Sequence, residues 1–127
     1  MWIMNRGALG AKQSEPYIVG QDYEIGVYVD ENFNRYPIYR KVVDCGQLTN
    51  ASSKTVAHGI SGEFRMVSIS GVMYGSNKKN GYPLPLVTGD INNTVYLAVG
   101  PNNITISPSS DRSSYTAIVV LEYYLVS

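Results

Sequence analysis

Residues 114–127, "SYTAIVVLEYYLVS", constrain the fold more than any other part of the sequence. In an extended strand, successive side chains point to opposite faces. One face then carries Ala117, Val119, Leu121, Tyr123 and Leu125, and the other carries Ile118, Val120, Glu122, Tyr124 and Val126. Because both faces are largely apolar, the pattern predicts a central strand that packs on two sides, one of them a candidate contact with another subunit.

The rest of the sequence reads as short strands separated by turns. Eleven tyrosines and twelve glycines are spread along the chain among many Val, Ile and Thr residues, a composition typical of strands and turns. The other candidate strands are residues 23–29, 37–45, 54–59, 63–75, 94–100 and 103–107. Asn80-Gly81 predicts a type I′ hairpin turn. We therefore expect an all-β domain over residues 22–127, an antiparallel β-sandwich of jelly-roll kind with seven or eight strands.

Residues 1–21 differ from the rest, because they mix Gly, Ala, Gln, Ser and Pro and show no period. Such an arm orders only when something outside the domain holds it. Trp2 is the one tryptophan of the sequence. Two interpretations of Trp2 stay open, a docking residue that is buried in a partner and a frayed chain end.

Composition argues against several classes of partner. Ten Lys and Arg balance ten Asp and Glu, so no net positive field attracts nucleic acid. No apolar run approaches the roughly 18 residues of a membrane helix, and the first residues lack a signal-peptide core; we expect a protein made in a cytoplasm without membrane insertion. The single cysteine, Cys45, forms no internal disulfide or multi-thiolate metal site and is predicted to be a buried, inert thiol.

The acidic residues and the single histidine do not form a recognisable catalytic motif. Glu122 lies inside the apolar terminal strand, where we expect it to be buried and paired with an arginine such as Arg40 or Arg112. His58, in "VAHGIS", is predicted to be a structural histidine at a strand end, since no serine stands in a G-x-S-x-G context. Phosphate, dinucleotide and calcium loops are also missing from the sequence. We expect no enzymatic activity, no cofactor and no metal site.

A candidate binding segment is "VMYGSNKKNGYPLPL", which interleaves aromatic, amide and lysine side chains. Such mixtures hold sugars or proteins, but they also occur at hairpin tips that bind nothing. The candidate receptor contacts are Tyr74, Asn77, Lys78, Lys79, Asn80 and Tyr82.

Three separated pieces of the sequence resemble a domain that recurs at the C-termini of bacteriophage tail-fibre and receptor-binding proteins. The first is Gly26, Tyr28 and Asp30 followed by "PIYRKV" at residues 37–42; the second is "VAHGI" at 56–60; the third is "RSSYTAIVVLEY" at 112–123. The resemblance extends from residue 23 to 127. Tyr28 stands where the family often has Trp, and "ENFNRY" replaces a two-residue Gly-Lys turn, so this loop is longer.

The resemblance implies a β-sandwich fibre head that associates as a parallel homotrimer in a virion. It also implies adhesion to the host surface, for which we expect a carbohydrate. We expect residues 1–21 to dock the trimer onto other virion proteins, as a short head fibre or a tail-tip subunit. Two alternatives are a capsid decoration subunit without a ligand and an enzymatic depolymerase. The candidate structural and assembly residues are Trp2, Tyr28, Pro37, Tyr39, Arg40, His58, Arg112 and Glu122.

The segment "YPIYRKVV" adds predictions about single side chains. Pro37 fits the first residue of a strand, where no ladder donor is required. Arg40 and Lys41 are adjacent, so they point to opposite faces and cannot form one substrate clamp. We expect Lys41 to reach solvent and Arg40 to find an acid, with Glu122 or a carboxylate of a neighbouring chain as candidates.

Overall fold

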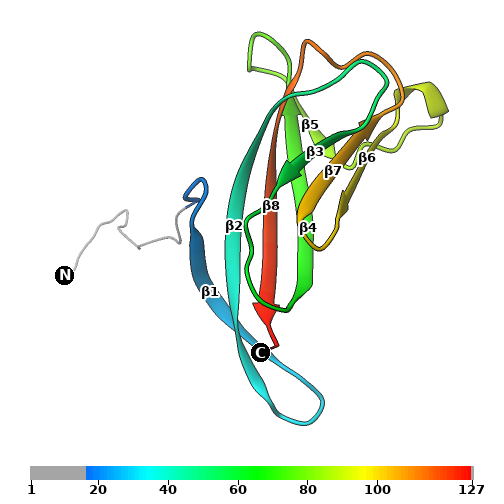
Figure 1. The fold of residues 1–127 in the computed structure, drawn as a ribbon. Coiled ribbons are helices and arrows are strands. Elements are labelled where there is room, and N and C mark those ends of the chain that lie inside the picture. The colour runs from blue at the N-terminus through cyan, green and yellow to red at the C-terminus, as the bar shows by residue number, and fades with distance from the viewer. Residues whose placement is uncertain (1–16, 127) are drawn as a thin grey trace, which may run out of the picture.

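The structure, a computed structural model, describes residues 17–126 of the chain. This part of the chain is all-β, and every pairing between its strands is antiparallel (Figure 1). The elements are β1 (Asp22–Val29), β2 (Arg35–Gln47), β3 (Lys54–Ala57), β4 (Phe64–Tyr74), β5 (Gly81–Leu84), the 3-10 helix η1 (Ile91–Asn93), β6 (Val95–Val99), β7 (Asn103–Pro108) and β8 (Thr116–Leu125). The all-β prediction is confirmed.

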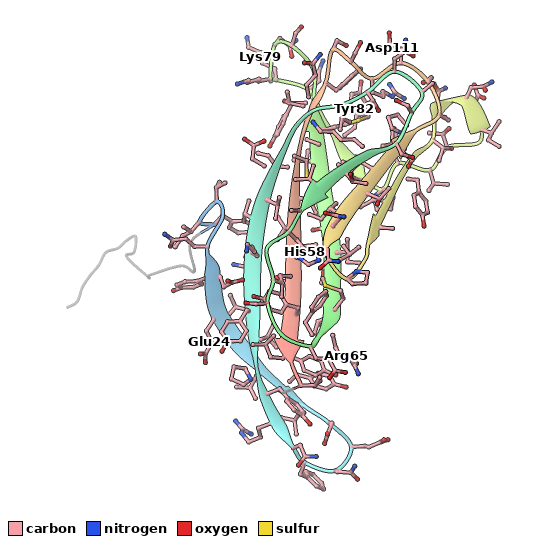
Figure 2. The ribbon with its side chains drawn as sticks, in the orientation of Figure 1. Glu24, His58, Arg65, Lys79, Tyr82 and Asp111 are labelled. Atoms are coloured by element: carbon pink, nitrogen blue, oxygen red, sulfur yellow. The ribbon has the colours of Figure 1, made fainter. Side chains whose placement is uncertain are left out.

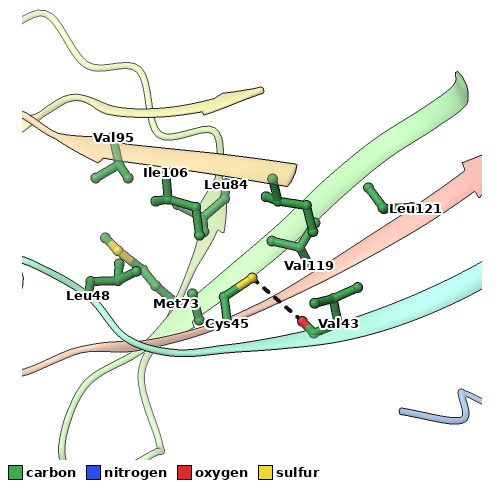
Figure 3. Packing of buried hydrophobic residues seen from close by; sticks show 11 residues of the cluster. Val43, Cys45, Leu48, Met73, Leu84, Val95, Ile106, Val119 and Leu121 are labelled. Carbon is green, nitrogen blue, oxygen red and sulfur yellow. Dashed lines mark hydrogen bonds between the residues drawn. The ribbon is translucent and has the colours of Figure 1, made fainter. Parts of the chain in front are cut away.

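The strands form two sheets whose facing sides enclose one hydrophobic core. The larger sheet has the order β1-β2-β8-β4-β5, and the smaller has the order β3-β7-β6. Buried side chains of both sheets meet between them (Figure 3). The cluster consists of Val43, Cys45, Leu48, Met73, Leu84, Val95, Ile104, Ile106, Ala117, Val119 and Leu121. Their alternation along β7 and β8 is the pattern of strands that bury one face.

Strand β8 is the centre of the larger sheet, as its sequence predicted, because β2 and β4 pair with it on either side. Ala117, Val119 and Leu121 are fully buried against the smaller sheet, and we call this side of the larger sheet its inner face. Alternation places Ile118 and Val120 on the outer face, where they are only half-buried. Within residues 17–126, no second sheet covers the outer face.

A short segment before β1 lies against β2. Val19 forms a parallel bridge with Val42, and the Gly20 N–H donates to the Val42 carbonyl at 2.7 Å. The Tyr17 ring lies over the Arg40 guanidinium, 4.5 Å from carbon to centroid. The end of the predicted arm thus contacts the sheet, whereas Trp2 lies outside the described residues.

Strands β1 and β2 continue beyond β8 as a two-stranded ribbon, residues 27–37, which protrudes below the sheets in Figure 1. The Asp30 carboxylate accepts from the N–H groups of Asn32 and Asn34, both at 2.9 Å, and Phe33 adopts a positive φ of 64° at the tip. The prediction that Pro37 begins a strand is wrong. It is the third residue of β2, in the ribbon, where it pairs with Val27 of β1 and the β2–β8 ladder has not yet begun.

The turn between β4 and β5 also differs from the prediction, because Asn80-Gly81 is not at its tip. Gly81 is the first residue of β5 and pairs with Tyr74. The Lys78 N–H donates to the Gly75 carbonyl at 3.0 Å, and the Asn77 side chain accepts from Lys79 N–H at 3.0 Å. This side-chain acceptor favours an earlier turn, in which Lys78 takes the positive φ of 58°. Strand β5 itself was not predicted.

Candidate functional site

A surface pocket of about 180 Å³ lies where the β4–β5 turn meets the loop before β8. We call it the tip pocket. Figure 2 shows Tyr82 and Lys79 at this end of the molecule, with Arg65 toward the other. The walls of the tip pocket combine small, amide and phenol side chains, from Gly75, Ser76, Asn77, Asn80, Tyr82, Ser114 and Tyr115.

Two tyrosine rings form the aromatic part of the tip pocket. Tyr82 lies on β5, and its ring meets that of Tyr115 nearly edge-on, at 6.1 Å and 66°. Arg112 stacks its guanidinium against Tyr115 at 5.4 Å, and the backbone of Tyr115 bonds to Leu48 and Arg112 at 2.8 and 2.9 Å. Tyr115 is therefore held by the fold, while Tyr82, 40% exposed, offers free ring surface.

The structure brings together three of the six predicted receptor contacts, namely Asn77, Asn80 and Tyr82. The other three, Tyr74, Lys78 and Lys79, do not line the pocket. Tyr74 follows Met73, which is fully buried on the inner face, so alternation directs Tyr74 to the outer face.

Sequence reasoning missed Ser114 and Tyr115 as pocket residues. They lie more than thirty positions from Tyr82 in the sequence, in the loop that leads into β8. An aromatic residue in front of an apolar strand is too common to identify a site. Only the pairing of β4 with both β5 and β8 brings these loops together.

On the outer face, Arg40 pairs with Glu122 directly across the β2–β8 ladder. The Arg40 Nε and Nη2 atoms donate to Glu122 Oε2 at 3.3 and 3.2 Å. Of the two candidates that the sequence left open for Arg40, Glu122 and a carboxylate of a neighbouring chain, the partner here is Glu122 of the same chain. The alternative partner, Arg112, lies elsewhere: its Nη2 donates to the Asn93 carbonyl at 3.4 Å.

His58 is buried, and the backbone engages both of its ring nitrogens. Nδ1 accepts from the Ile60 N–H at 3.1 Å, so the proton is on Nε2, which lies 3.0 Å from the Gly100 carbonyl oxygen. The ring also meets Phe64 edge-on at 5.3 Å. These contacts give His58 a structural role, at the end of β3 where the sequence placed it.

Cys45 lies in the core, with its Sγ atom 3.8 Å from the Val43 carbonyl oxygen (Figure 3). Burial raises the pKa of the Cys45 thiol to about 11, because the thiolate would lose its hydration. At neutral pH the side chain is a protonated, inaccessible thiol, as the sequence predicted.

Lys41 does not reach solvent, contrary to the prediction. It pairs with Leu121 and so faces inward, where only 9% of its surface is exposed. A Cβ added to Gly59 would stand 3.1 Å from the Lys41 Nζ atom. The amino group of Lys41 therefore lies against the connection between β3 and β4. The prediction failed because the strand pattern does not show what covers a face.

Aromatic side chains occupy both faces of the larger sheet near the ribbon. On the outer face, Tyr28 stacks on Tyr124 at 4.6 Å and 10°, and Tyr36 lies 5.0 Å from Tyr124. On the inner face, Tyr39 lies beside Tyr123 at 5.8 Å. Burial and a hydrogen bond to Asp22 raise the pKa of Tyr123, so its hydroxyl remains a donor.

Among residues 17–126, no group of three or more His, Cys, Asp or Glu side chains is arranged to hold a metal ion. In the same part of the chain, no helix has the length and apolar character needed to cross a membrane.

No family model, curated protein or solved structure shows a significant match to this chain.

Proposed function

We propose that this chain is a non-enzymatic structural protein of a bacteriophage virion, a short fibre that binds carbohydrate on the host surface. In this proposal the sandwich is of jelly-roll kind and assembles as a homotrimer, attached to other virion proteins through residues 1–21 as a head fibre or tail-tip subunit. The assignment to a virion comes from the sequence resemblance. The observation that carries ligand binding is the tip pocket.

The tip pocket has the chemistry that a sugar requires. The exposed ring of Tyr82 can stack on the C–H face of a pyranose. The amides of Asn77 and Asn80 each offer donors and an acceptor, and the Ser114 hydroxyl offers both. Sugar hydroxyls need this combination, and Tyr115 provides a fixed wall beside it.

A non-enzymatic role is supported by what the reactive side chains already do. Glu122 is bound by Arg40, the His58 nitrogens face backbone groups, and Cys45 is buried. Each of these groups contributes to the fold and is not presented to a substrate.

Trimer formation is supported by the outer face of the larger sheet. Ile38, Ile118, Val120 and Tyr124 are all half-buried there, although no sheet within residues 17–126 packs on them. Apolar side chains that no sheet of the described residues covers are typical of a surface that a second subunit covers.

A capsid decoration protein without a ligand is the second candidate, and the ribbon favours it. Val27, Val29 and Phe33 are exposed there, on a two-stranded element that is marginally stable by itself. A protruding apolar ribbon is suited to contact with another virion protein.

Glycan arrays and host-cell binding test the proposal. We expect Tyr82→Ala to reduce binding at least about fivefold, because stacking on an aromatic ring contributes about 1 kcal/mol or more. Tyr96→Ala is the matched control, since Tyr96 is 57% exposed on β6 of the other sheet. Tyr74→Ala should also leave binding unchanged.

Three outcomes would overturn parts of this proposal. Equal losses from Tyr82→Ala and Tyr96→Ala would remove the tip pocket as the binding site. An unmutated protein that binds no glycan but is stoichiometric on capsids would establish decoration instead. Release of reducing sugar ends from a host polysaccharide would show that the protein is an enzyme.

A further inference from the structure

A second pocket, of about 140 Å³, lies on the inner face of the larger sheet and is lined by Asp22, Tyr39, Ser61, Tyr123 and Leu125. We call it the inner pocket. It contacts β8 through Tyr123 and Leu125, near the end of that strand, whereas the tip pocket contacts Ser114 and Tyr115 before its start. The two pockets are therefore separate sites.

The inner pocket places one carboxylate beside two phenol rings. The Tyr123 hydroxyl donates to Asp22 Oδ1, which orients the carboxylate. Tyr39 and Tyr123 lie beside each other with centroids 5.8 Å apart and planes inclined by 33°. Tyr123 is almost completely buried, so this wall is fixed by the packing of the sheet.

Asp22 has no cationic partner among residues 17–126. The ion pairs in that part of the chain join Arg40 to Glu122 and Arg65 to Glu63. The nearest lysine along the ladder is Lys41, which is opposite Asp22 in the β1–β2 register but has its amino group against Gly59. The Asp22 side chain is exposed, so a ligand can reach its carboxylate, with which no cation among residues 17–126 forms an ion pair.

A carboxylate next to aromatic rings is the arrangement that binds organic ammonium groups, through charge attraction and cation–π contact. We propose that the inner pocket binds an alkylammonium group, with Asp22 as the counter-ion and Tyr39 and Tyr123 as the aromatic walls. Its volume suits one small head group. Because Lys41 adds a positive charge nearby, we expect a dissociation constant on the order of 1–10 mM for an isolated head group. This inference does not depend on the carbohydrate proposal.

Two sources present this chemistry, the side chain of a lysine in a partner protein and a quaternary ammonium such as choline on a surface polymer or lipid. Butylammonium represents the first and choline the second. The uncharged tert-butyl analogue of choline has the same shape without the charge, so it reports binding by shape alone.

The experiment is a titration of the isotope-labelled full chain with each compound, followed through the amide resonances of Ser61 and Leu125. We expect saturable shifts with butylammonium or choline and none with the uncharged analogue. The stronger of the two ammonium ligands identifies the source. Asp22→Asn should weaken binding at least about tenfold, and Tyr39→Leu should weaken it by a similar factor.

Glu24→Gln is the matched control, because it removes the same charge two residues along β1, where Figure 2 labels Glu24. Glu24 is opposite Tyr39 in the β1–β2 ladder but does not line the inner pocket. We expect its affinity to stay within about twofold of the unmutated chain. Absence of saturable shifts, equal binding of the uncharged analogue, or equal weakening by Glu24→Gln and Asp22→Asn would each overturn the proposal. The comparison of ligands uses the unmutated protein, so it remains valid if a variant does not fold. Tyr82→Ala should leave these shifts unchanged even if glycan binding is lost.

Discussion

Arg40 and Glu122 are 82 residues apart in the sequence and form one ion pair at the centre of the larger sheet, with Arg40 Nη2 3.2 Å from Glu122 Oε2. Their side chains are 12% and 26% exposed, while those of the Arg65–Glu63 pair are 53% and 61% exposed. The surrounding strands thus partly shield the first pair from water, and water surrounds the second.

Arg40→Ala should lower the free energy of unfolding by about 2 kcal/mol, because it leaves a partly buried carboxylate without its partner. Arg65→Ala is the control and should cost less than about 1 kcal/mol, since exposed pairs contribute little. Urea denaturation of both variants measures the difference. Equal effects would show that Arg40 is not important to the packing of β2 on β8.

Ser70→Arg should convert the proposed trimer to monomers. Ser70 is exposed and pairs with Val120 on the outer face, so an arginine there would bring a long charged side chain into the proposed subunit contact. Thr55→Arg, at an exposed position on β3 of the smaller sheet, is the control. Native mass measurement at micromolar concentration gives the oligomeric state. A monomeric unmutated protein would remove the trimer from the proposal, and a trimeric Ser70→Arg variant would move the interface elsewhere.

Stability should fall at alkaline pH through Cys45. Its pKa is about 11 in the folded chain against an ordinary value of 9.0, so the unfolded chain loses this proton first as pH rises. The contribution of the protonated Cys45 thiol to the free energy of unfolding is therefore complete below pH 9. It is lost between about pH 9 and 11, with a total of about 2–3 kcal/mol. Unfolding measured across this range should show the loss in the unmutated chain and a smaller loss in Cys45→Ala. Tyrosines also ionise between pH 9 and 11. If both proteins lose the same stability over this range, the loss comes from other groups and not from Cys45.

Gly71→Ala should destabilise the fold by about 2–3 kcal/mol. A Cβ at this position would stand 2.9 Å from the Ile118 carbonyl oxygen and 3.3 Å from side-chain atoms of Leu84 and Val119. The backbone of β8 cannot move away without losing its pairing. Gly89→Ala, which meets nothing within 4 Å, is the control in the same thermal unfolding assay. A stability equal to that of the control would show that β4 can shift relative to β8.

The sequence predicted those features that depend on alternation within a strand. The two apolar faces of residues 116–125 predicted the central position of β8, and the same period put Arg40 and Lys41 on opposite faces. Features that depend on contacts between distant segments were not predictable. The burial of Lys41 depends on the β3–β4 connection near Gly59, and the tip pocket depends on Tyr115, which comes from another loop.

The turn before β5 illustrates a local limit of the same kind. Asn80-Gly81 is the strongest hairpin signal in the segment, but the Asn77 side chain bonds to the Lys79 N–H and forms the turn three residues earlier. Two turn signals in one loop compete, and the pairing of Gly81 with Tyr74 decides between them. The position of this turn determines where Tyr82 lies. Tyr82 is one of the two aromatic residues of the tip pocket.

The central position of β8 also sets the order in which the protein can fold during synthesis. Strands β2 and β4 leave the ribosome well before β8, and they do not pair with each other. Until residues 116–125 emerge, the larger sheet lacks its central strand. The β1–β2 and β4–β5 pairs then each expose an unpaired strand edge that is prone to aggregate. Chaperones that bind extended apolar segments should therefore associate with this chain until its β8 strand is inserted between the other two.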